Sequence, residues 1–148
     1  MDRRRFVVLL GAAGIAPGGG CLGRDDPPDE PAYGDWFDNV RNFEGFVDRT
    51  DRDPVTVLVG TGDRGWQFDP AAVSVAPGTT VVWEWTGRGG DHNVEHRDTD
   101  WENPGGTVAE EGHTWEREFT EPGTHLYTCW PHDGLGMRGG VFVDAHAQ

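Results

Sequence analysis

Short segments rich in β-branched and aromatic residues recur along most of this chain, and they constrain its fold more than any other feature. Six of them follow one another, at residues 55–60, 71–78, 79–87, 113–123, 124–129 and 139–144. Glycine and proline separate them, as in Pro77-Gly78 and Pro122-Gly123. Because regularly spaced short strands must pair and bury one face, the pattern predicts an all-β sandwich or barrel of roughly 110 residues.

One of these segments shows which face is buried. In residues 79–87 the larger or β-branched side chains occupy every second position, at Thr79, Val81, Trp83 and Trp85. Successive residues of a strand point to opposite faces of the sheet. We therefore assign this tryptophan-rich face to the core of the sandwich rather than to a cofactor site.

The first 20 residues have the organisation of an export signal. Three arginines precede an apolar run from Phe6 to Ala16 that is about half as long as a membrane span. Arg3 and Arg4 resemble a twin-arginine motif, and residues 18–21 resemble a lipobox in which Cys21 becomes the lipid-bearing first residue. We expect residues 1–20 to be a signal peptide and Cys21 to be lipidated. A plain cleaved signal peptide and an uncleaved anchor are the alternatives.

Residues 21–34 follow as an acidic, proline-rich segment that cannot bury a core, and we interpret them as a tether. The domain is then expected to span residues 35–148. At its start, Trp36, Val40 and Phe43 have the i, i+4, i+7 spacing of one helical face, with Asp35 as a candidate N-cap. This spacing predicts a short N-terminal helix packed on the sandwich.

The chain is strongly acidic, with 26 acidic and 12 basic residues and a net charge of −14, and every basic residue is arginine. Without residues 1–20, 25 acidic and 9 basic residues remain, a net charge of −16. Such a charge repels itself in dilute buffer, whereas in molar salt the Debye length falls to about 3 Å. The composition predicts adaptation to high salt. An acidic surface that attracts a basic partner is a compatible alternative, and no nucleic-acid partner is expected.

Cys129 lies in the sequence TCWPHDGLGM and is one of only two cysteines. If Cys21 carries lipid, Cys129 has no disulfide partner in an oxidising compartment, so it is either reactive or bound to metal. With His132 and Met137 it forms the pattern C-x2-H-x4-M, and His92, after a glycine-rich loop, is the candidate second imidazole. A thiolate, two imidazoles and a thioether are typical of electron-transfer copper, whereas a thioether is not among the usual ligands of zinc.

These motifs resemble the halocyanins, the haloarchaeal members of the blue copper (cupredoxin) family. The resemblance runs from about Trp36 to Val143 and includes DWFDNVRNFEG, FDPAAVSVAPGTTVVWEWTG, HNV and GTHLYTCWPHDGLGMRGGVFV. It implies a cupredoxin Greek-key β-sandwich of about eight strands with a short N-terminal helix. It also implies one copper ion per chain, in a trigonal plane of two imidazoles and a thiolate with a weak axial thioether, from His92, Cys129, His132 and Met137.

The same resemblance implies supporting roles around these ligands. Asn93 is expected to hydrogen-bond across to the loop after the cysteine and so to fix the ligand geometry. Pro131 lacks an N–H that could otherwise hydrogen-bond the thiolate sulfur, and with fewer such bonds the site is expected to favour Cu(II) less. His132 is expected to be the exposed ligand through which electrons pass. Trp130 stands where the family usually has a smaller polar residue. It packs outside the ligand loop, shields copper from water, or extends a docking surface.

The remaining histidines are not expected to bind the copper. His96 is four residues from His92, about 13 Å along a strand, so it cannot reach the same ion. We expect His96 on a strand face or at the surface, and His125 buried and hydrogen-bonded. His113 and His146 are assigned no role.

The sequence therefore predicts a type 1 (blue) copper protein that is not an enzyme and carries single electrons by cycling between Cu(I) and Cu(II). It is expected at the extracytoplasmic face of the cell membrane, lipid-anchored after export, as a monomer that meets redox proteins of a membrane electron-transport chain. An extracytoplasmic copper carrier or chaperone without an electron-transfer role is the alternative. Only two methionines occur, one of them the initiator, which counts against the Met-rich sites of such carriers.

Overall fold

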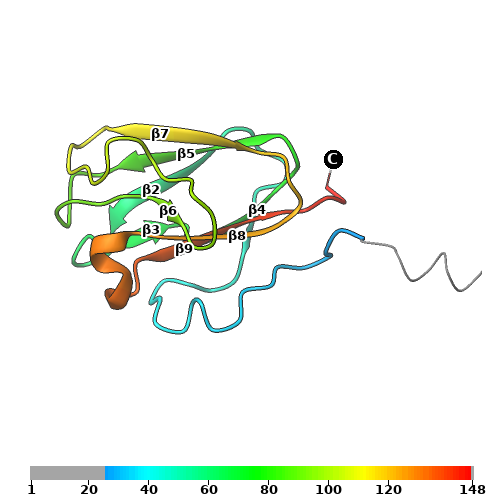
Figure 1. Cartoon of the computed structure of the whole chain (residues 1–148), viewed down its shortest axis with the longest axis horizontal. Coiled ribbons are helices and arrows are strands. Elements are labelled where there is room, and N and C mark those ends of the chain that lie inside the picture. Colours follow the sequence, from blue (N-terminus) through cyan, green and yellow to red (C-terminus); the bar gives the residue numbers. More distant parts are fainter. Residues whose placement is uncertain (1–25, 148) are drawn as a thin grey trace, which may run out of the picture.

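A computed structural model describes residues 26–147, which form two β-sheets packed face to face (Figure 1). One sheet has the strand order β1-β4-β9-β8-β6 and the other the order β3-β2-β5-β7. The strands are β1 Val47–Asp48, β2 Val55–Thr61, β3 Gln67–Asp69, β4 Ala72–Val75, β5 Thr79–Trp85, β6 Glu95–His96, β7 Thr114–Phe119, β8 Gly123–Thr128 and β9 Arg138–Val143. The prediction of an all-β sandwich is confirmed, with nine strands in the described part of the chain where about eight were expected.

Both sheets mix parallel and antiparallel pairs. β4 pairs in parallel with β1 and β9, and β2 pairs in parallel with β5, while the other pairs are antiparallel. The predicted alternation in residues 79–87 is confirmed, because Val81, Trp83 and Trp85 are buried while Glu84 is exposed. Trp83 stacks on Trp115 of β7 and meets Tyr127 of the opposite sheet edge-on, so the two layers are joined by aromatic contacts.

The predicted short N-terminal helix is not observed. Residues 34–39 instead form consecutive turns, each closed by a bond between residues three apart, such as Trp36 N–H to Tyr33 C=O at 3.0 Å. The segment is rich in Asp, Asn and Gly, which are weak helix formers. Its aromatic residues also do not share one helical face, because Phe37 stacks on Phe43 with ring centroids 4.0 Å apart. The need to bury these rings together outweighs the helical spacing.

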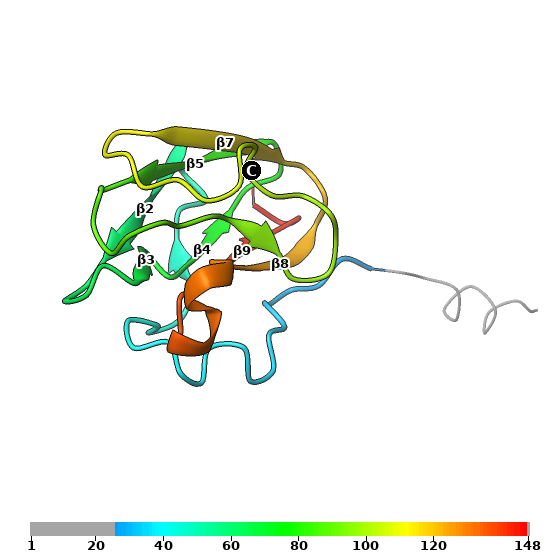
Figure 2. The ribbon, with the colours of Figure 1, turned by 60° about the vertical axis from the view of Figure 1, so that its left-hand side comes forward.

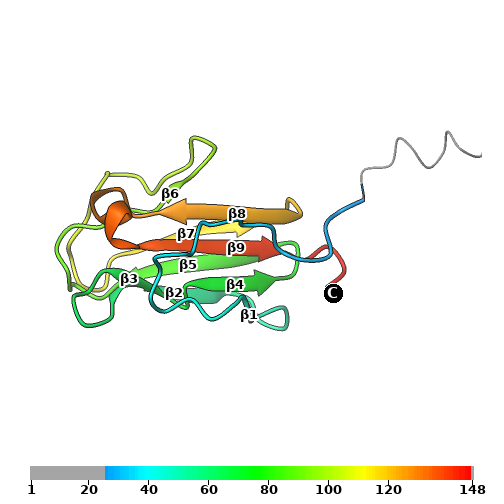
Figure 3. The same cartoon turned by 90° about the horizontal axis from the view of Figure 1, so that it is seen from below.

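This N-terminal segment covers the outer face of the five-stranded sheet (Figure 3). Phe37 and Val40 pack there with Ala71, Ala72 and Leu126, which explains why β9 is buried on both of its faces. Within the segment interpreted as a tether, the Ala32 N–H donates to the Thr124 hydroxyl at 2.9 Å. The signal peptide, the lipobox and Cys21 lie outside the described residues. Within residues 26–147, no helix is long and apolar enough to cross a membrane.

The two ends of the sandwich carry different features. At one end lie the loops after β2, β5 and β8, together with the short 3-10 helix η2, Trp130–Leu135 (Figure 1). Figure 2 shows η2 beside the turns of residues 34–39, where the Asn39 side chain donates to the carbonyl of Gly134. The C-terminus and residues 26–31 lie at the opposite end (Figures 1 and 3). The loops that carry the candidate ligands therefore lie at the end of the sandwich opposite residues 26–31.

Candidate metal centre

Cys129 and Met137 bracket the loop between β8 and β9. The Cys129 N–H donates to the Met137 carbonyl at 3.0 Å, and the Thr128 hydroxyl donates to the same carbonyl at 3.2 Å. Both side chains are completely buried in the core cluster between the sheets. The loop is thus closed by hydrogen bonds within the protein, which position the two sulfur-bearing residues.

His132 sits at a kink inside η2, with φ −121° where a regular helix would continue. Its N–H donates to the Cys129 carbonyl at 3.1 Å, and its own carbonyl accepts from the Met137 N–H at 3.2 Å. Pro131 occupies the first turn of η2, where a missing N–H costs nothing. This course of the backbone directs the imidazole of His132 back toward Cys129.

Three donor atoms converge at this end of the sandwich. One ligand atom each from His92, Cys129 and His132 lies within 4.8 Å of the others. The Cys129 Sγ atom is 3.6 Å from Nδ1 of His92 and 3.5 Å from Nδ1 of His132. The sequence prediction joined these residues across 37 positions of chain, and the fold brings them together.

The orientation of His92 is set by its second ring nitrogen. Nε2 donates to the Arg88 carbonyl at 2.7 Å, which leaves Nδ1 unprotonated and directed at the sulfur. The backbone of His92 pairs in both directions with Val108, and the indole N–H of Trp85 donates to the His92 carbonyl at 3.2 Å. A histidine held in this way is typical of a metal ligand.

The protonation states of the three groups suit a metal ion. Burial lowers the pKa of His92 and of His132, so both imidazoles are neutral at neutral pH and can act as ligands. Burial raises the pKa of the Cys129 thiol to about 11, so this group becomes a thiolate only when a cation compensates its charge. Two neutral imidazoles and a buried thiol beside Met137 therefore fit a copper ion, which accepts both nitrogen and soft sulfur donors.

Two glycine-containing loops, after β2 and after β5, pack beside His92, and this support was not predicted from the sequence. Gly89 has φ +85°, and a side chain at this position would collide with the Gly65 carbonyl and come within 2.9 Å of Nε2 of His92. A side chain on Gly65 would lie 2.6 Å from the Gly89 nitrogen. The loops after β2 and β5 can therefore touch only because both positions lack a Cβ atom. The clustered glycines in GTGDRG and GRGG are the sequence feature from which this close packing of loops could have been predicted.

Asn93, the predicted brace, joins the two ligand loops. Its Oδ1 accepts the Trp130 N–H at 2.7 Å, and its Nδ2 donates to Glu95 at 3.2 Å. The side chain is buried, so this contact is shielded from competing water. The bond links the residue after His92 to the residue after Cys129.

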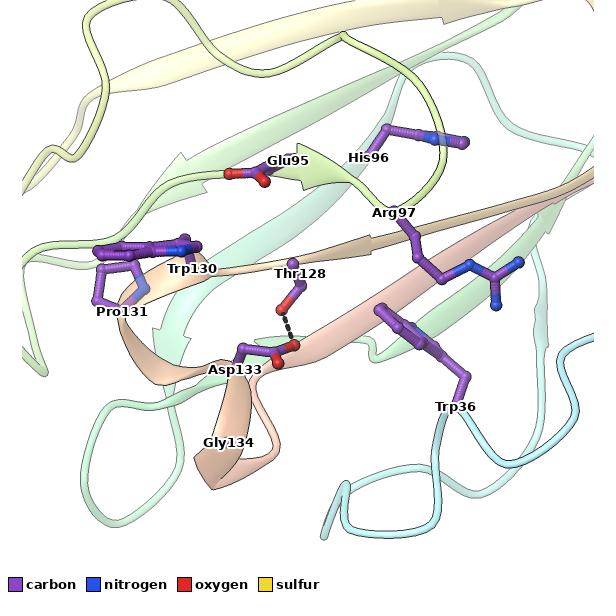
Figure 4. A pocket seen from close by; sticks show the side chains of 9 residues that line it. All are labelled: Trp36, Glu95, His96, Arg97, Thr128, Trp130, Pro131, Asp133 and Gly134. Atoms are coloured by element: carbon purple, nitrogen blue, oxygen red, sulfur yellow. Dashed lines mark hydrogen bonds between the residues drawn. The ribbon is translucent and has the colours of Figure 1, made fainter.

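Trp130 itself is 70% exposed. It borders an open groove on one side of η2, which we name the Trp130 groove (Figure 4) and which is lined by Trp36, Glu95, His96, Arg97, Thr128, Trp130, Pro131, Asp133 and Gly134. Asp133 accepts the Thr128 hydroxyl at 2.6 Å and an Arg138 N–H at 3.0 Å, which fixes one wall. The exposed indole therefore contributes an aromatic surface to the edge of this groove.

A different tryptophan covers His132. Trp66, in the loop before β3, stacks on the imidazole with ring centroids 5.2 Å apart and planes at 21°. Its indole N–H donates to the Gly89 carbonyl at 3.1 Å, which ties it to the loop that carries His92. His132, expected to be exposed, is therefore only partly accessible. Trp66 carried no sequence signal, because it belongs to no motif and reaches the ligand only through the fold.

The other histidines lie away from the three converging donors. His96 lies in β6, which agrees with the expected strand-face position, and its side chain is buried, with Nδ1 accepting the N–H groups of Asp98 and Thr99. His125 is hydrogen-bonded to the Glu121 carbonyl at 3.0 Å and is partly buried. His113 meets Trp85 edge-on, and the exposed His146 has its Nε2 2.8 Å from a carboxylate oxygen of Asp29.

Comparison with known proteins agrees with this geometry. A sequence profile of copper-binding proteins of the plastocyanin/azurin family matches residues 55–144. The chain is 41% identical to halocyanin of Natronomonas pharaonis, covering 97% of this chain and 98% of that protein. It is 36% identical to plastocyanin A/B of Petroselinum crispum over 60% of this chain and 98% of the plastocyanin.

A solved structure shares the fold. Oxidised plastocyanin from Dryopteris crassirhizoma superimposes with a TM-score of 0.51 and 22% identity, over 60% of this chain and 99% of the plastocyanin. His92, Cys129, His132 and Met137 are positioned as a copper site, and one copper ion is typical of this fold. Because the profile covers more than half of the chain and halocyanin matches it almost end to end, the chain belongs to the plastocyanin/azurin family of copper-binding proteins, as a cupredoxin of the halocyanin type.

Proposed function

We propose that this protein is a one-electron carrier that holds a single copper ion between His92, Cys129, His132 and Met137. When bound, the ion supplies the redox chemistry, because it alternates between Cu(I) and Cu(II). The chain's own contribution is to keep the donors in place. The observation that carries the proposal is that Sγ lies 3.5–3.6 Å from both Nδ1 atoms, with the His92 ring held by the Arg88 carbonyl and the backbone of Cys129 and His132 held within the ligand loop.

Such a preformed site favours electron transfer over catalysis or copper delivery. A site that does not rearrange has little reorganisation to undergo when its charge changes. Four protein ligands also leave no open position for a substrate, which a catalytic metal requires. Burial of the sulfur atoms and the hydrogen-bonded ligand loop slow the loss of metal, whereas a copper chaperone must release its ion readily.

A redox cycle combined with a copper-transfer assay separates the two functions. The copper-loaded protein should be reduced by ascorbate and reoxidised by hexacyanoferrate(III) over many cycles with full recovery of its colour. In the reduced state it should lose copper to a Cu(I) chelator far more slowly than it exchanges electrons. Rapid, complete loss of copper to the chelator would instead favour the carrier or chaperone function.

We further propose that the carrier works at the extracytoplasmic face of the membrane, anchored through Cys21, as a monomer that meets redox proteins of an electron-transport chain. The proposal is supported by the export-signal pattern and by the position of residues 26–31, which leave the domain opposite η2 (Figure 1). An anchor at that end would leave the ligand loops facing outward. One lipid chain alone binds membranes only marginally, so a second signal would be needed for stable attachment.

Cell fractionation tests the anchor. Replacing Cys21 with serine should move the protein from the membrane fraction to the soluble fraction while its copper colour is unchanged. A Cys21→Ser variant that stays on the membrane would exclude lipidation at this residue.

A further inference from the structure

A second groove lies on the other side of η2, and we name it the Trp66 groove. It has a volume of about 480 Å³ and is lined by Arg41, Thr61, Gly62, Asp63, Arg64, Trp66, Gln67, Leu135 and Gly136. Leu135 is 55% exposed, so the groove offers an apolar contact as well as polar rims. Because residues of the β2–β3 loop, η2 and the N-terminal segment line it, a molecule seated there would contact all three.

One residue that lines this groove, Trp66, connects it to the metal centre. The Trp66 indole lines the groove and stacks on His132 at 5.2 Å, and the Arg64 guanidinium lies 5.4 Å from the Trp66 ring centroid. Trp66 is also tied to Gly89 beside His92. A redox centre docked in the groove would therefore be separated from the ligand by a single aromatic ring.

The charge of the Trp66 groove differs from that of the chain. The whole chain carries −14, yet the groove is lined by two exposed arginines, Arg41 and Arg64, and by one acid, Asp63. The Trp130 groove on the other side of η2 has the opposite balance, with Glu95 and Asp133 against Arg97. The Trp66 groove is therefore better suited than the Trp130 groove to bind a negatively charged partner.

We propose that the Trp66 groove is the docking surface for a redox partner protein that presents carboxylates. This inference rests on the proposed electron-carrier function and names the partner's chemistry. One electron passes from the reduced copper protein through His132 and Trp66 to the oxidised partner, and no bond is made or broken. At 0.1 M salt the Debye length is about 10 Å, so the arginines attract a carboxylate across the groove, whereas at 1 M it is about 3 Å and most of this attraction is screened.

Electron transfer to inorganic complexes of opposite charge tests the proposal. The Cu(I) protein is oxidised either by hexacyanoferrate(III), an anion, or by tris(phenanthroline)cobalt(III), a cation. At 0.1 M salt Arg41→Gln and Arg64→Gln should each slow oxidation by the anion about fivefold, and Asp63→Asn should speed it by a similar factor. At 1 M salt each effect should fall below about twofold.

A matched control removes the same charge elsewhere. Arg52 lies before β2, about 20 Å along the strand from the groove, so Arg52→Gln should change the anionic rate by less than about 1.5-fold. Equal effects of Arg52→Gln and Arg64→Gln would overturn the proposal, since only net charge would then matter. A slower oxidation of Asp63→Asn by the anion would also overturn the proposal, because a local disturbance of the structure rather than charge would then explain the effects. If the wild-type protein transfers electrons to neither complex, the electron-carrier function itself fails.

Nuclear magnetic resonance locates the contact independently of electron transfer. Hexacyanochromate(III), a paramagnetic and inert anion, should broaden the amides of residues 61–67 and 135–136 of the Cu(I) protein, and poly-L-glutamate should reverse this broadening. Broadening centred on residues 128–133 would place the contact in the Trp130 groove and contradict the proposal. Reversal by chloride at constant ionic strength but not by polyglutamate would indicate a pocket for small anions only. Concentration-dependent broadening without any probe would indicate a second copy of this chain.

Discussion

Gly89→Ala is the substitution whose effect the structure specifies most sharply. Gly89 has φ +85°, and a Cβ atom there would meet the Gly65 carbonyl and the ring of His92, whereas a Cβ atom on its neighbour Gly90, which has φ +90°, would meet nothing within 4 Å. Both substitutions impose left-handed backbone on alanine, which costs about 1–2 kcal/mol. Only Gly89→Ala also forces two backbone segments apart, and overpacking of this kind adds about 1–3 kcal/mol.

Calorimetry and copper titration of both variants measure this difference. For a domain of about 100 residues, 1 kcal/mol lowers the Tm by about 4–8 °C, so Gly90→Ala should lose about 5 °C and Gly89→Ala about 10 °C or more. Because the displaced loop supports His92, Gly89→Ala should also weaken copper binding about 10- to 100-fold, while Gly90→Ala leaves it unchanged. Equal Tm losses and equal copper affinities in the two variants would refute the role given to close backbone contact.

Four further predictions concern proton release, alkaline stability, the Asn93 hydrogen bond and the effect of salt. Copper binding at pH 7.5 should release about one proton per ion, measured by calorimetry in buffers of different ionisation enthalpy, because the pKa of the buried Cys129 thiol is raised to about 11. For the same reason the metal-free protein should lose stability between about pH 9 and 11, since the unfolded state gives up that proton first; a flat profile would contradict the burial effect. Asn93→Ala should lower the free energy of unfolding, measured in urea, by about 1–3 kcal/mol and weaken copper binding, because the Trp130 N–H loses its acceptor. The control Asn42→Ala, which removes a 2.7 Å hydrogen bond to the Phe68 carbonyl, should lower stability without changing copper binding. The Tm of the metal-free domain should rise between 0.1 M and 2 M salt, and a constant Tm would argue against adaptation to salt.

Features that depend on local pattern could be predicted from the sequence. The alternation in residues 79–87 specifies which face of β5 is buried, and residue chemistry alone pointed to Cys129, His132 and Met137. His92 could be added as the second imidazole because it follows a loop rich in glycine, although it lies 37 residues before Cys129.

Features that depend on contacts between distant loops could not be predicted in this way. The spacing of Trp36, Val40 and Phe43 fits a helix, yet burial of Phe37 against Phe43 over the five-stranded sheet produces turns instead. Trp66 reaches His132 only because three loops meet at one end of the sandwich. Three short strands, β1, β3 and β6, are also set by pairing rather than by propensity, because two or three residues carry too little pattern to identify.

The central claim is that one copper ion is held by the Cys129 thiolate and two imidazoles, and addition of Cu(II) to the purified domain tests it most directly. The account predicts an intense blue colour from thiolate-to-copper charge transfer that saturates at one equivalent per chain and is absent in Cys129→Ser. A pale or colourless product, or a blue colour that persists in Cys129→Ser, would contradict it.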